Sequence, residues 1–506
     1  MASTQWLKPI NTRRNANAET KLEEEEPLTP GARLFHAPQF NCCIIAVIGC
    51  KTKINADVIK EGLKHTLIKH PRFSSNLVLD PKKAGKPTGW IRTQVNMDDH
   101  VIIPDFNPNM DSPDQFLEDY VSNITKTPMD LSKPLWEIHL LNIKTREANS
   151  VAVFRIHHSI GDGISLMSLV LACTRQTANP DALPTLPIDT NKKKKKRKIT
   201  SLSSSLGFLS CFFGLMFIFK LLWYTLIDLV MFMATSLWLK DTKTPVKGGP
   251  GVGSTPKRFV YRIVSLDDIK LVKKALDVTI NDVILGITQA GLSSYLNRKY
   301  GEIKGEEEAR EENLPKHIRL RTTFLVNLRQ TSTIEDLAEK MESSTKGRWN
   351  WGNSIGYIMF PFHIAIRDDP LDHIRNAKAT IDKKKLSLEA ICTYIIAKIV
   401  LKILGLRVLA ALAHRVLSHA TLSFSNIVGP KEEISFYGHP IVFIAPSVYG
   451  HPQALTVHFQ SYMDKMTFVL AVDQDVISDP QRLCDDIEES LRLANKAIVE
   501  QKLIKS

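Results

Sequence analysis

Two adjacent histidines, His157 and His158, begin the run HHSIGDG, which ends at Gly163 and has residue types suited to catalysis. A neutral imidazole has a pKa near 6.5, so it accepts a proton at cellular pH. A hydroxyl group is a much weaker acid, and its full deprotonation by a histidine would cost roughly 12 kcal/mol. The proton must therefore move while the hydroxyl attacks its target, which is general base catalysis.

Asp162 lies four residues after His158, and two roles are open for it. It could orient the imidazole, or it could pair with a distant arginine and hold the turn. We favour the pairing role, because a loop with two glycines needs an outside contact to fix it. The histidines could also be satisfied core or loop residues. A zinc site is less favoured, because no third His or Cys lies nearby at ligand spacing.

The flanking sequence predicts the elements that position this run. Residues 151–154 alternate β-branched and bulky side chains, which predicts a buried strand. Apolar residues recur at helical spacing from Ile164 to Thr174. The histidines therefore end a strand, and a tight turn leads into a helix. Side chains at such a strand end can point into a cleft.

The run HHSIGDG resembles the active-site motif of the acyltransferase superfamily that includes chloramphenicol acetyltransferase and peptide-synthetase condensation domains. Three further stretches narrow the resemblance to the bifunctional wax ester synthase/diacylglycerol acyltransferases, most closely their plant branch: Pro134–Trp136 (PLW), Asn281–Gly286 (NDVILG) and Ser425–Pro430 (SNIVGP). The resemblance covers about residues 28–495. The last motif usually has proline where Val428 stands, a departure that concerns the local turn.

The resemblance implies an α/β fold of two similar domains of the chloramphenicol acetyltransferase type. Each would be a mainly antiparallel mixed sheet with helices, and the two would meet at a central tunnel. It also implies that His158 is the general base, that His157 gives structural support, and that Asp162 forms a structural salt bridge with an arginine from the other half. Arg329 is the first candidate for that arginine, and Arg321 is the second.

Four more positions follow from the resemblance. Asn281 and Asp282 would help to shape the site, although the pattern from Thr279 to Asp282 by itself predicts only the cap of a long helix. A tetrahedral intermediate needs hydrogen-bond donors, for which Asn426 and the backbone near Gly163 are candidates.

The implied activity is acyl-CoA-dependent O-acylation of a lipid alcohol. We rank wax ester formation from long-chain fatty alcohols first, with triacylglycerol formation from diacylglycerol as a side activity. Two alternatives stay open: an enzyme acting mainly on diacylglycerol, and a non-catalytic protein that binds membrane lipids. We expect no cofactor and no metal, with acyl-CoA as co-substrate. A covalent acyl-enzyme is not expected, because no Ser or Cys elbow accompanies the histidines.

Composition is that of an ordinary globular protein: 506 residues, 43% of them apolar and 24% charged. The seven cysteines are scattered, odd in number and without a Cys-x-x-Cys pair, which favours reduced thiols in the cytosol. The first 40 residues contain no apolar run, so we expect no cleavable signal peptide. We expect a flexible segment over residues 1–27, an N-terminal acyltransferase domain over 28–190, an insertion over 191–257 and a C-terminal acyltransferase domain over 258–506.

The insertion predicts a contact with membrane lipids. Residues 192–198 are six lysines and an arginine, which supply seven of the net +13 charges. Such a run can also mark a nucleic-acid patch, but here a long apolar segment follows at residues 206–239. A polybasic cluster beside an apolar segment is typical of binding to anionic lipid on the cytoplasmic face. We therefore expect no nucleic-acid partner, and a location at the endoplasmic reticulum membrane, with the plasma membrane as second choice.

A single crossing by residues 206–239 is disfavoured, because it would put His158 and the C-terminal half on opposite sides of the membrane. We expect a helical hairpin or an embedded, non-crossing anchor with both halves in the cytosol; a buried soluble helix pair is the alternative. Residues 241–258 are predicted to be a flexible linker. Ile391 to Val416 is predicted to be one helix, either in the core or on the membrane surface.

Overall fold

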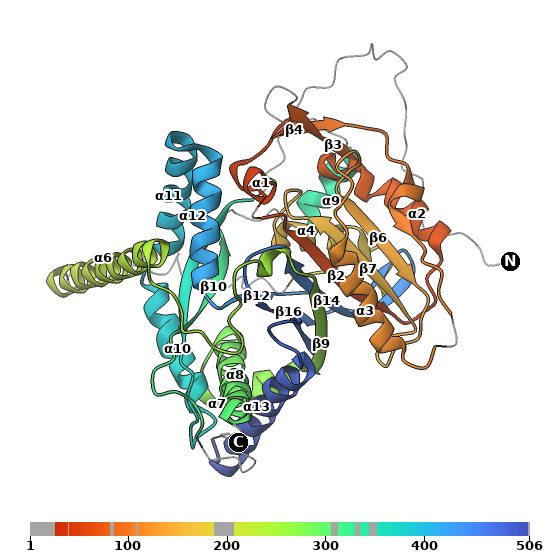
Figure 1. The fold of residues 1–506 in the computed structure, drawn as a ribbon. Helices are drawn as coiled ribbons and strands as arrows, with labels where there is room; N and C mark the ends of the chain where they lie inside the picture. The colour runs from red at the N-terminus through yellow and green to blue at the C-terminus, as the bar shows by residue number, and fades with distance from the viewer. Residues whose placement is uncertain are drawn as a thin grey trace. The chain divides into compact units, whose positions relative to one another are not determined.

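The computed structural model describes residues 26–38, 40–80, 86–107, 110–186, 207–304, 312–328, 334–343, 351 and 353–503. The chain divides into two compact units, and Figure 1 shows the elements of each. Unit 1 takes in Met1–Thr185, Arg329–Ser354 and Glu432–Tyr449, whereas unit 2 takes in Leu186–Leu328, Ile355–Lys431 and Gly450–Ser506.

Unit 1 is built on a seven-stranded sheet in the order β5-β6-β7-β2-β14-β13-β8, beside a three-stranded sheet, β1-β4-β3. Neighbours in the larger sheet are antiparallel except β5 and β6. The strands are β1 (Glu26–Pro27), β2 (Cys43–Cys50), β3 (Ser75–Asp80), β4 (Lys86–Arg92), β5 (Val101–Ile102), β6 (Trp136–Leu141), β7 (Ser150–His157), β8 (Thr174–Gln176), β13 (Ile434–Phe436) and β14 (His439–Tyr449). The helices are α1 (Pro30–Phe35), α2 (Ala56–His65), α3 (Pro113–Lys126), α4 (Gly163–Ala172) and α9 (Ile334–Ser343).

Unit 1 is discontinuous in sequence, because a late strand lies inside its sheet. β14 pairs with β2 from Ile441 opposite Cys50 to Tyr449 opposite Cys43. Without β14, the largely buried strand β2 would be a bare sheet edge, which proteins avoid. The expected split into 28–190 and 258–506 therefore does not follow the structural division, since residues 329–354 and 432–449 belong to unit 1.

Unit 2 contains a six-stranded mixed sheet in the order β11-β10-β12-β15-β16-β9. β12 runs parallel to both β10 and β15, and the other pairs are antiparallel. The strands are β9 (Lys257–Ser265), β10 (Leu320–Asn327), β11 (Ile355–Phe362), β12 (Leu422–Ile427), β15 (Leu455–Tyr462) and β16 (Lys465–Asp473). The helices are α6 (Gly207–Leu237), α7 (Leu266–Leu276), α8 (Ile280–Lys304), α10 (Asp372–Lys385), α11 (Glu389–Ile403), α12 (Gly405–His419) and α13 (Pro480–Glu500). The expectation of two mainly antiparallel mixed sheets with helices is confirmed.

The apolar segment of the insertion is one continuous helix, α6, and not the helical hairpin that was one of our two expectations. Its stretch Phe213–Leu237 is the one helix among the described residues that is long and apolar enough to cross a membrane, and most of its side chains are exposed or half-buried. Figure 1 shows α6 projecting from unit 2 beyond α11 and α12. The polybasic run at 192–198 lies outside the described residues.

The segment after α6 is packed and is not a flexible linker. Val246 is fully buried in the core of unit 2, and Asp241 and Lys257 are also buried. Lys257 donates from Nζ to the Val252 carbonyl oxygen at 2.6 Å and pairs with Asp473 at 3.3 Å. Glycine and proline content alone suggested flexibility, but buried apolar and paired charged side chains fix this segment.

Residues 389–419 form two helices where the sequence pattern predicted one. α11 ends at Ile403, and α12 begins at Gly405, whose φ is +81°. Glycine adopts this left-handed conformation without the steric penalty that other residues incur. The hydrophobic period continues across the break, so it could not reveal the break.

Candidate active site

The two histidines lie where strand β7 ends, in the seven-stranded sheet of unit 1. Every residue of β7 is buried between β2 and β6, and His157 lies opposite Cys43. The chain leaves the sheet at His158, whose backbone N–H donates to the Cys42 carbonyl oxygen at 2.9 Å. The predicted strand, turn and helix are therefore present, with α4 starting at Gly163.

His158 is buried, and it contacts the aromatic ring of Phe35 and the side-chain amide of Asn353. The residue is 6% exposed, and its ring stacks on Phe35 of α1 with centroids 4.1 Å apart. The Asn353 side chain donates from Nδ2 to the His158 carbonyl oxygen at 3.0 Å. His158 Nδ1 is buried and makes no hydrogen bond of good geometry to any described residue. Phe35 and Asn353 therefore restrain the ring and the backbone of this histidine.

The electrostatics of the pocket favour the neutral, proton-accepting form of His158. Burial lowers the pKa of His158 below its usual value of 6.5, while its own carbonyl group, Asp162 and Asn353 act to raise it. The net result is a pKa below the usual value. Because the imidazole stays unprotonated at neutral pH, it is available as a base.

His157 has both ring nitrogens engaged. Nδ1 lies 2.7 Å from the Ser159 hydroxyl oxygen, and Nε2 lies 3.2 Å from Asn41 Oδ1. The ring also stacks on His36 at 4.4 Å. Burial, followed by the neighbouring His36, His158 and Arg155, lowers the pKa of His157 well below its usual value. An imidazole held on both sides supports the structural role that we predicted for it.

Arg155, two residues before His157, ties β7 to its neighbours. It is 3% exposed, and its Nη1 pairs with Glu137 Oε1 of β6 at 2.8 Å. Its Nε donates to the Tyr449 hydroxyl oxygen of β14 at 2.7 Å. This buried charge network connects three strands directly behind the histidines and so fixes the register of the strand that carries them.

Asp162 caps the helix that follows the motif. Its Oδ1 accepts from the Ser165 backbone N–H at 2.9 Å, and the residue is 4% exposed. Arg329, its predicted salt-bridge partner, lies outside the described residues, so that pair stays a prediction. Gly163 is the first residue of α4. A helix N-terminus presents unpaired N–H groups, so its position suits the predicted role as a donor.

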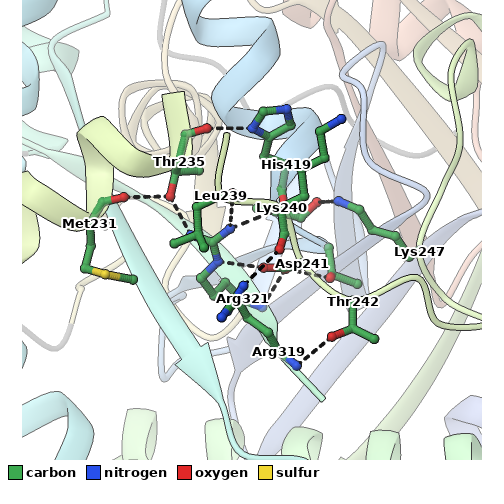
Figure 2. A network of polar contacts seen from close by, with 12 residues as sticks. Met231, Thr235, Leu239, Lys240, Asp241, Thr242, Lys247, Arg319, Arg321 and His419 are labelled. Atoms are coloured by element: carbon green, nitrogen blue, oxygen red, sulfur yellow. Dashed lines mark hydrogen bonds and ion pairs between the residues drawn. The ribbon is translucent and has the colours of Figure 1, made fainter. Parts of the chain in front are cut away.

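Arg321, our second choice for that pair, has another carboxylate partner. Figure 2 shows it at the centre of a buried network in unit 2. Its Nε donates to Asp241 Oδ1 at 2.6 Å and its backbone N–H to Asp241 Oδ2 at 2.7 Å. Nη1 contacts the Thr235 hydroxyl of α6, and Nη2 donates to the Leu239 carbonyl oxygen at 2.9 Å. The network joins the end of α6 to β10.

Two of the other predicted site residues come together in unit 2. Asn426 of β12 donates from Nδ2 to Asn281 Oδ1 at 2.7 Å, although the two lie 145 residues apart in the chain. Asp282 forms the predicted cap of α8, because its Oδ2 accepts from the backbone N–H and the hydroxyl of Thr279 at 2.7 and 2.8 Å. The capping role of Asp282 is confirmed, while the contribution of these residues to catalysis stays a prediction.

Five residues around the histidines were not found from the sequence. They lie between 116 and 195 residues from their partners and carry no motif of their own: Phe35, His36, Asn41, Trp351 and Asn353. Among the described residues, no group of three or more His, Cys, Asp or Glu side chains is arranged to hold a metal ion.

Comparison with known proteins gives a consistent result over both units. Residues 51–284 match the family described as the wax ester synthase/diacylglycerol acyltransferase catalytic domain, and residues 351–494 match the WS/DGAT C-terminal domain. Wax ester synthase/diacylglycerol acyltransferase 5 of Arabidopsis thaliana is 54% identical over 97% of this chain and 98% of its own length.

Two solved structures share the fold. One is a wax ester synthase/diacylglycerol acyltransferase from Marinobacter aquaeolei VT8, with a TM-score of 0.56 and 17% identity over 93% of this chain and 99% of that one. The other is the first condensation domain of the calcium-dependent antibiotic synthetase, with a TM-score of 0.54 and 11% identity over 93% of this chain and 96% of that one. The two-domain acyltransferase fold that the sequence predicted is thereby confirmed.

Proposed function

The chain belongs to the wax ester synthase/diacylglycerol acyltransferase family, and from this premise we propose that it is an acyl-CoA-dependent O-acyltransferase acting on long-chain fatty alcohols to form wax esters. Diacylglycerol is the second acceptor, giving triacylglycerol, because the relatives are named for both activities. The observation that carries the proposal is the buried His158, which follows β7 within the HHxxxDG run and stacks on Phe35, and whose pKa is lowered by burial.

The proposed reaction is a direct transfer. His158 takes the proton of the acceptor hydroxyl as the oxygen attacks the thioester carbonyl carbon. The new C–O bond gives a tetrahedral intermediate, whose oxyanion needs donors such as the Gly163 N–H or Asn426. Collapse of the intermediate breaks the C–S bond, and the imidazolium returns the proton to the departing CoA thiolate. Acyl-CoA is the co-substrate, and no resident cofactor or metal takes part in this scheme.

An acceptor assay tests this proposal. Membranes containing the protein are incubated with labelled acyl-CoA and either hexadecanol or diacylglycerol, and the lipid products are separated. We expect labelled wax ester to form faster than labelled triacylglycerol. Faster triacylglycerol formation would reverse the acceptor ranking, and the absence of both products would contradict the proposal. A labelled protein adduct trapped during turnover would replace direct transfer with a covalent intermediate.

We also propose that α6 inserts into one leaflet of the endoplasmic reticulum membrane from the cytosolic side. All residues from Phe213 to Lys220 are exposed, and all but Gly214 and Lys220 are large and apolar. The C-terminal half of the helix is instead fastened to unit 2. Asp228 pairs with Lys384 of α10 at 2.7 Å, and the Thr225 hydroxyl accepts from the Leu388 N–H at 3.0 Å.

α6 does not cross the bilayer, because β2 precedes it and β14 follows it in the chain, yet these two strands pair in one sheet. Residues 207–224, which precede the Thr225 and Asp228 contacts, span about 27 Å at 1.5 Å per residue, against a hydrocarbon core of about 30 Å. Burying Asp228 to gain length would break its ion pair and cost roughly 2.5–3.5 kcal/mol on insertion scales. The helix therefore enters the membrane without crossing it, and both halves of the chain stay on one side. The plasma membrane is the alternative location.

Neighbouring helices extend the same apolar surface. α11 and α12 contact α6, and α11 exposes Ile395, Ile399 and Ile403. Lys398 and Lys402 are exposed on the same helix, as is typical of a helix that lies at an anionic lipid surface. The surface formed by α6, α11 and α12 thus combines apolar side chains with positive charge.

Fractionation tests the membrane contact. The double variant Phe217→Glu, Leu222→Glu should move the protein from the membrane pellet to the soluble fraction, because both side chains are more than half exposed on α6. Ile303→Glu is the matched control, since Ile303 is 70% exposed at the end of α8. Equal membrane binding by wild type and the double variant would refute the anchor. A lumenal epitope after residue 300 would refute the one-sided topology.

A further inference from the structure

The turn that carries His158 is held by a short segment distant in sequence. Trp351 donates from Nε1 to the Ile160 carbonyl oxygen at 2.6 Å, and Asn353 donates from Nδ2 to the His158 carbonyl oxygen at 3.0 Å. Both residues lie in unit 1 with the histidines. Two main-chain carbonyl groups of the motif are therefore bound by side chains that have no motif of their own.

Asn353 is placed by close packing against α1. A Cβ atom added to Gly31 would lie 2.6 Å from Asn353 Cβ, so only glycine fits at that position of the helix. The same helix supplies Phe35, which stacks on the His158 ring. Asn353 and Phe35 thus restrain the histidine together, and the spacing of α1 from residue 353 sets where the amide lies.

His158 Nδ1 and Asn353 Oδ1 are both buried, and neither makes a hydrogen bond of good geometry to a described residue. The His158 carbonyl group and the Asn353 side chain nevertheless both raise the pKa of the His158 ring. Both residues are 6% exposed, and they are already joined through the Nδ2 contact. A buried polar group without a hydrogen-bond partner is unfavourable, because it has lost its contact with water. An imidazole N–H is a donor and an amide oxygen is an acceptor, so one bond between them would satisfy both atoms.

We propose that Asn353 is a positioning residue for His158, which fixes the carbonyl group through Nδ2 and accepts the Nδ1–H through Oδ1. The proton then resides on Nδ1, and Nε2 keeps the lone pair that takes the proton of the acceptor hydroxyl. This inference rests on the proposed acyl transfer, because it assigns the nitrogen that acts in that reaction. It differs from a catalytic role, since Asn353 acts through His158 alone.

The test compares Asn353→Ala and Asn353→Asp with wild type in the labelled acyl-CoA assay with hexadecanol. Loss of the amide should lower kcat roughly 100-fold with little change in KM for acyl-CoA, because small misplacements of a base have effects of this size. Asn353→Asp keeps the shape and an acceptor oxygen but loses the Nδ2 donor to the His158 carbonyl oxygen, so circular dichroism must first show that each variant folds.

The pH profile separates positioning from a general loss of structure. The groups that raise the pKa of the His158 ring are its own carbonyl group, Asp162 and Asn353, and His157 is adjacent in the chain. Asn353 raises the pKa of His158. The acid limb of kcat/KM should therefore move to lower pH in Asn353→Ala and to higher pH in Asn353→Asp, where a carboxylate would favour the imidazolium.

Asn142→Ala is the matched control. Asn142 also brackets a backbone segment, accepting from the Ile54 N–H at 2.7 Å and donating to the Ile54 carbonyl oxygen at 3.0 Å. We expect this variant to have a lower melting temperature and an unchanged acid limb. If wild type is active and the acid limb of kcat/KM stays at the same pH in both Asn353 variants, the inference is wrong. An inactive wild type would contradict the proposed function instead.

Discussion

At the scale of single residues, His158 is held by side chains from distant parts of the chain, among them Phe35 and Asn353. The run from His157 to Gly163 was found because its residue types and spacing are rare. The contacts that hold it come from residues as far away as Asn353, which is 195 positions from His158. Nothing local in a sequence identifies such a partner, since an asparagine serves equally well in turns, caps and on surfaces.

Asp162 allows a prediction that separates its two interactions. Asparagine caps a helix about as well as aspartate, so Asp162→Asn should keep the bond to the Ser165 N–H. If the buried carboxylate also pairs with Arg329, that variant should lose about 3–5 kcal/mol of unfolding free energy together with activity. Chemical denaturation measures the loss. A variant with wild-type stability and lower turnover would contradict the tether role and favour an orienting role.

At the scale of elements, periodicity predicted the strands and helices around the site but missed breaks and contacts. Ser265 caps α7, because its hydroxyl accepts from the Asp267 N–H at 3.1 Å. Periodicity could not reveal the break at Gly405, because the apolar pattern continues through it. It also could not predict that α6 is fastened along half its length, since Asp228 and Lys384 are 156 residues apart.

Glu389 makes the contact between α6 and α10 depend on pH, because Glu389 and Asp228 both pair with Lys384. Burial raises its pKa to about 7, although Lys384 lies 2.8 Å away and the Met359 N–H donates to it at 2.9 Å. A carboxyl whose pKa is raised in the folded state stabilises most below about pH 4.5, and this contribution is lost as the pH rises through 7. The unfolding free energy of wild type relative to Glu389→Gln should therefore fall by about 3 kcal/mol between pH 5 and pH 8.

Glu137→Gln is the control for this measurement. Despite burial, hydrogen bonds from His139 and Arg155 lower the pKa of Glu137 to about 2. Its contribution is complete above about pH 4.5 and is lost only toward pH 2, so its stability difference from wild type should stay flat between pH 5 and pH 8. A flat difference for Glu389→Gln as well would show that Glu389 is ionised throughout that range.

At the scale of the whole molecule, the family and the fold class were predictable because the motifs are ordered along nearly the entire chain. The division into units was not predictable. Membership in a sheet depends on which strands pair, and β14 joins β2 across almost 400 residues of sequence. Composition marks the insertion at 191–257, but it carries no information about this return of the chain to unit 1.

This discontinuity predicts that the N-terminal half does not fold alone. A fragment of residues 26–186 lacks β14, so β2 becomes an open edge, and it also lacks Tyr449, which contacts Arg155. We expect aggregation or non-cooperative unfolding, and rescue when residues 207–503 are produced in the same cell. Circular dichroism during thermal unfolding is the measurement. A monomeric fragment with a single cooperative transition would contradict the division described above.

The most direct test of the general base is the rate of His158→Ala with labelled acyl-CoA and hexadecanol. We expect kcat to fall about 100-fold to 10,000-fold, with acyl-CoA binding and membrane association retained. His65→Ala is the control, because His65 is an exposed histidine that contacts only Glu61 among the described ion pairs, and it should keep the wild-type rate. A wild-type rate in His158→Ala would show that another group takes the proton, and the account of catalysis given above would be wrong.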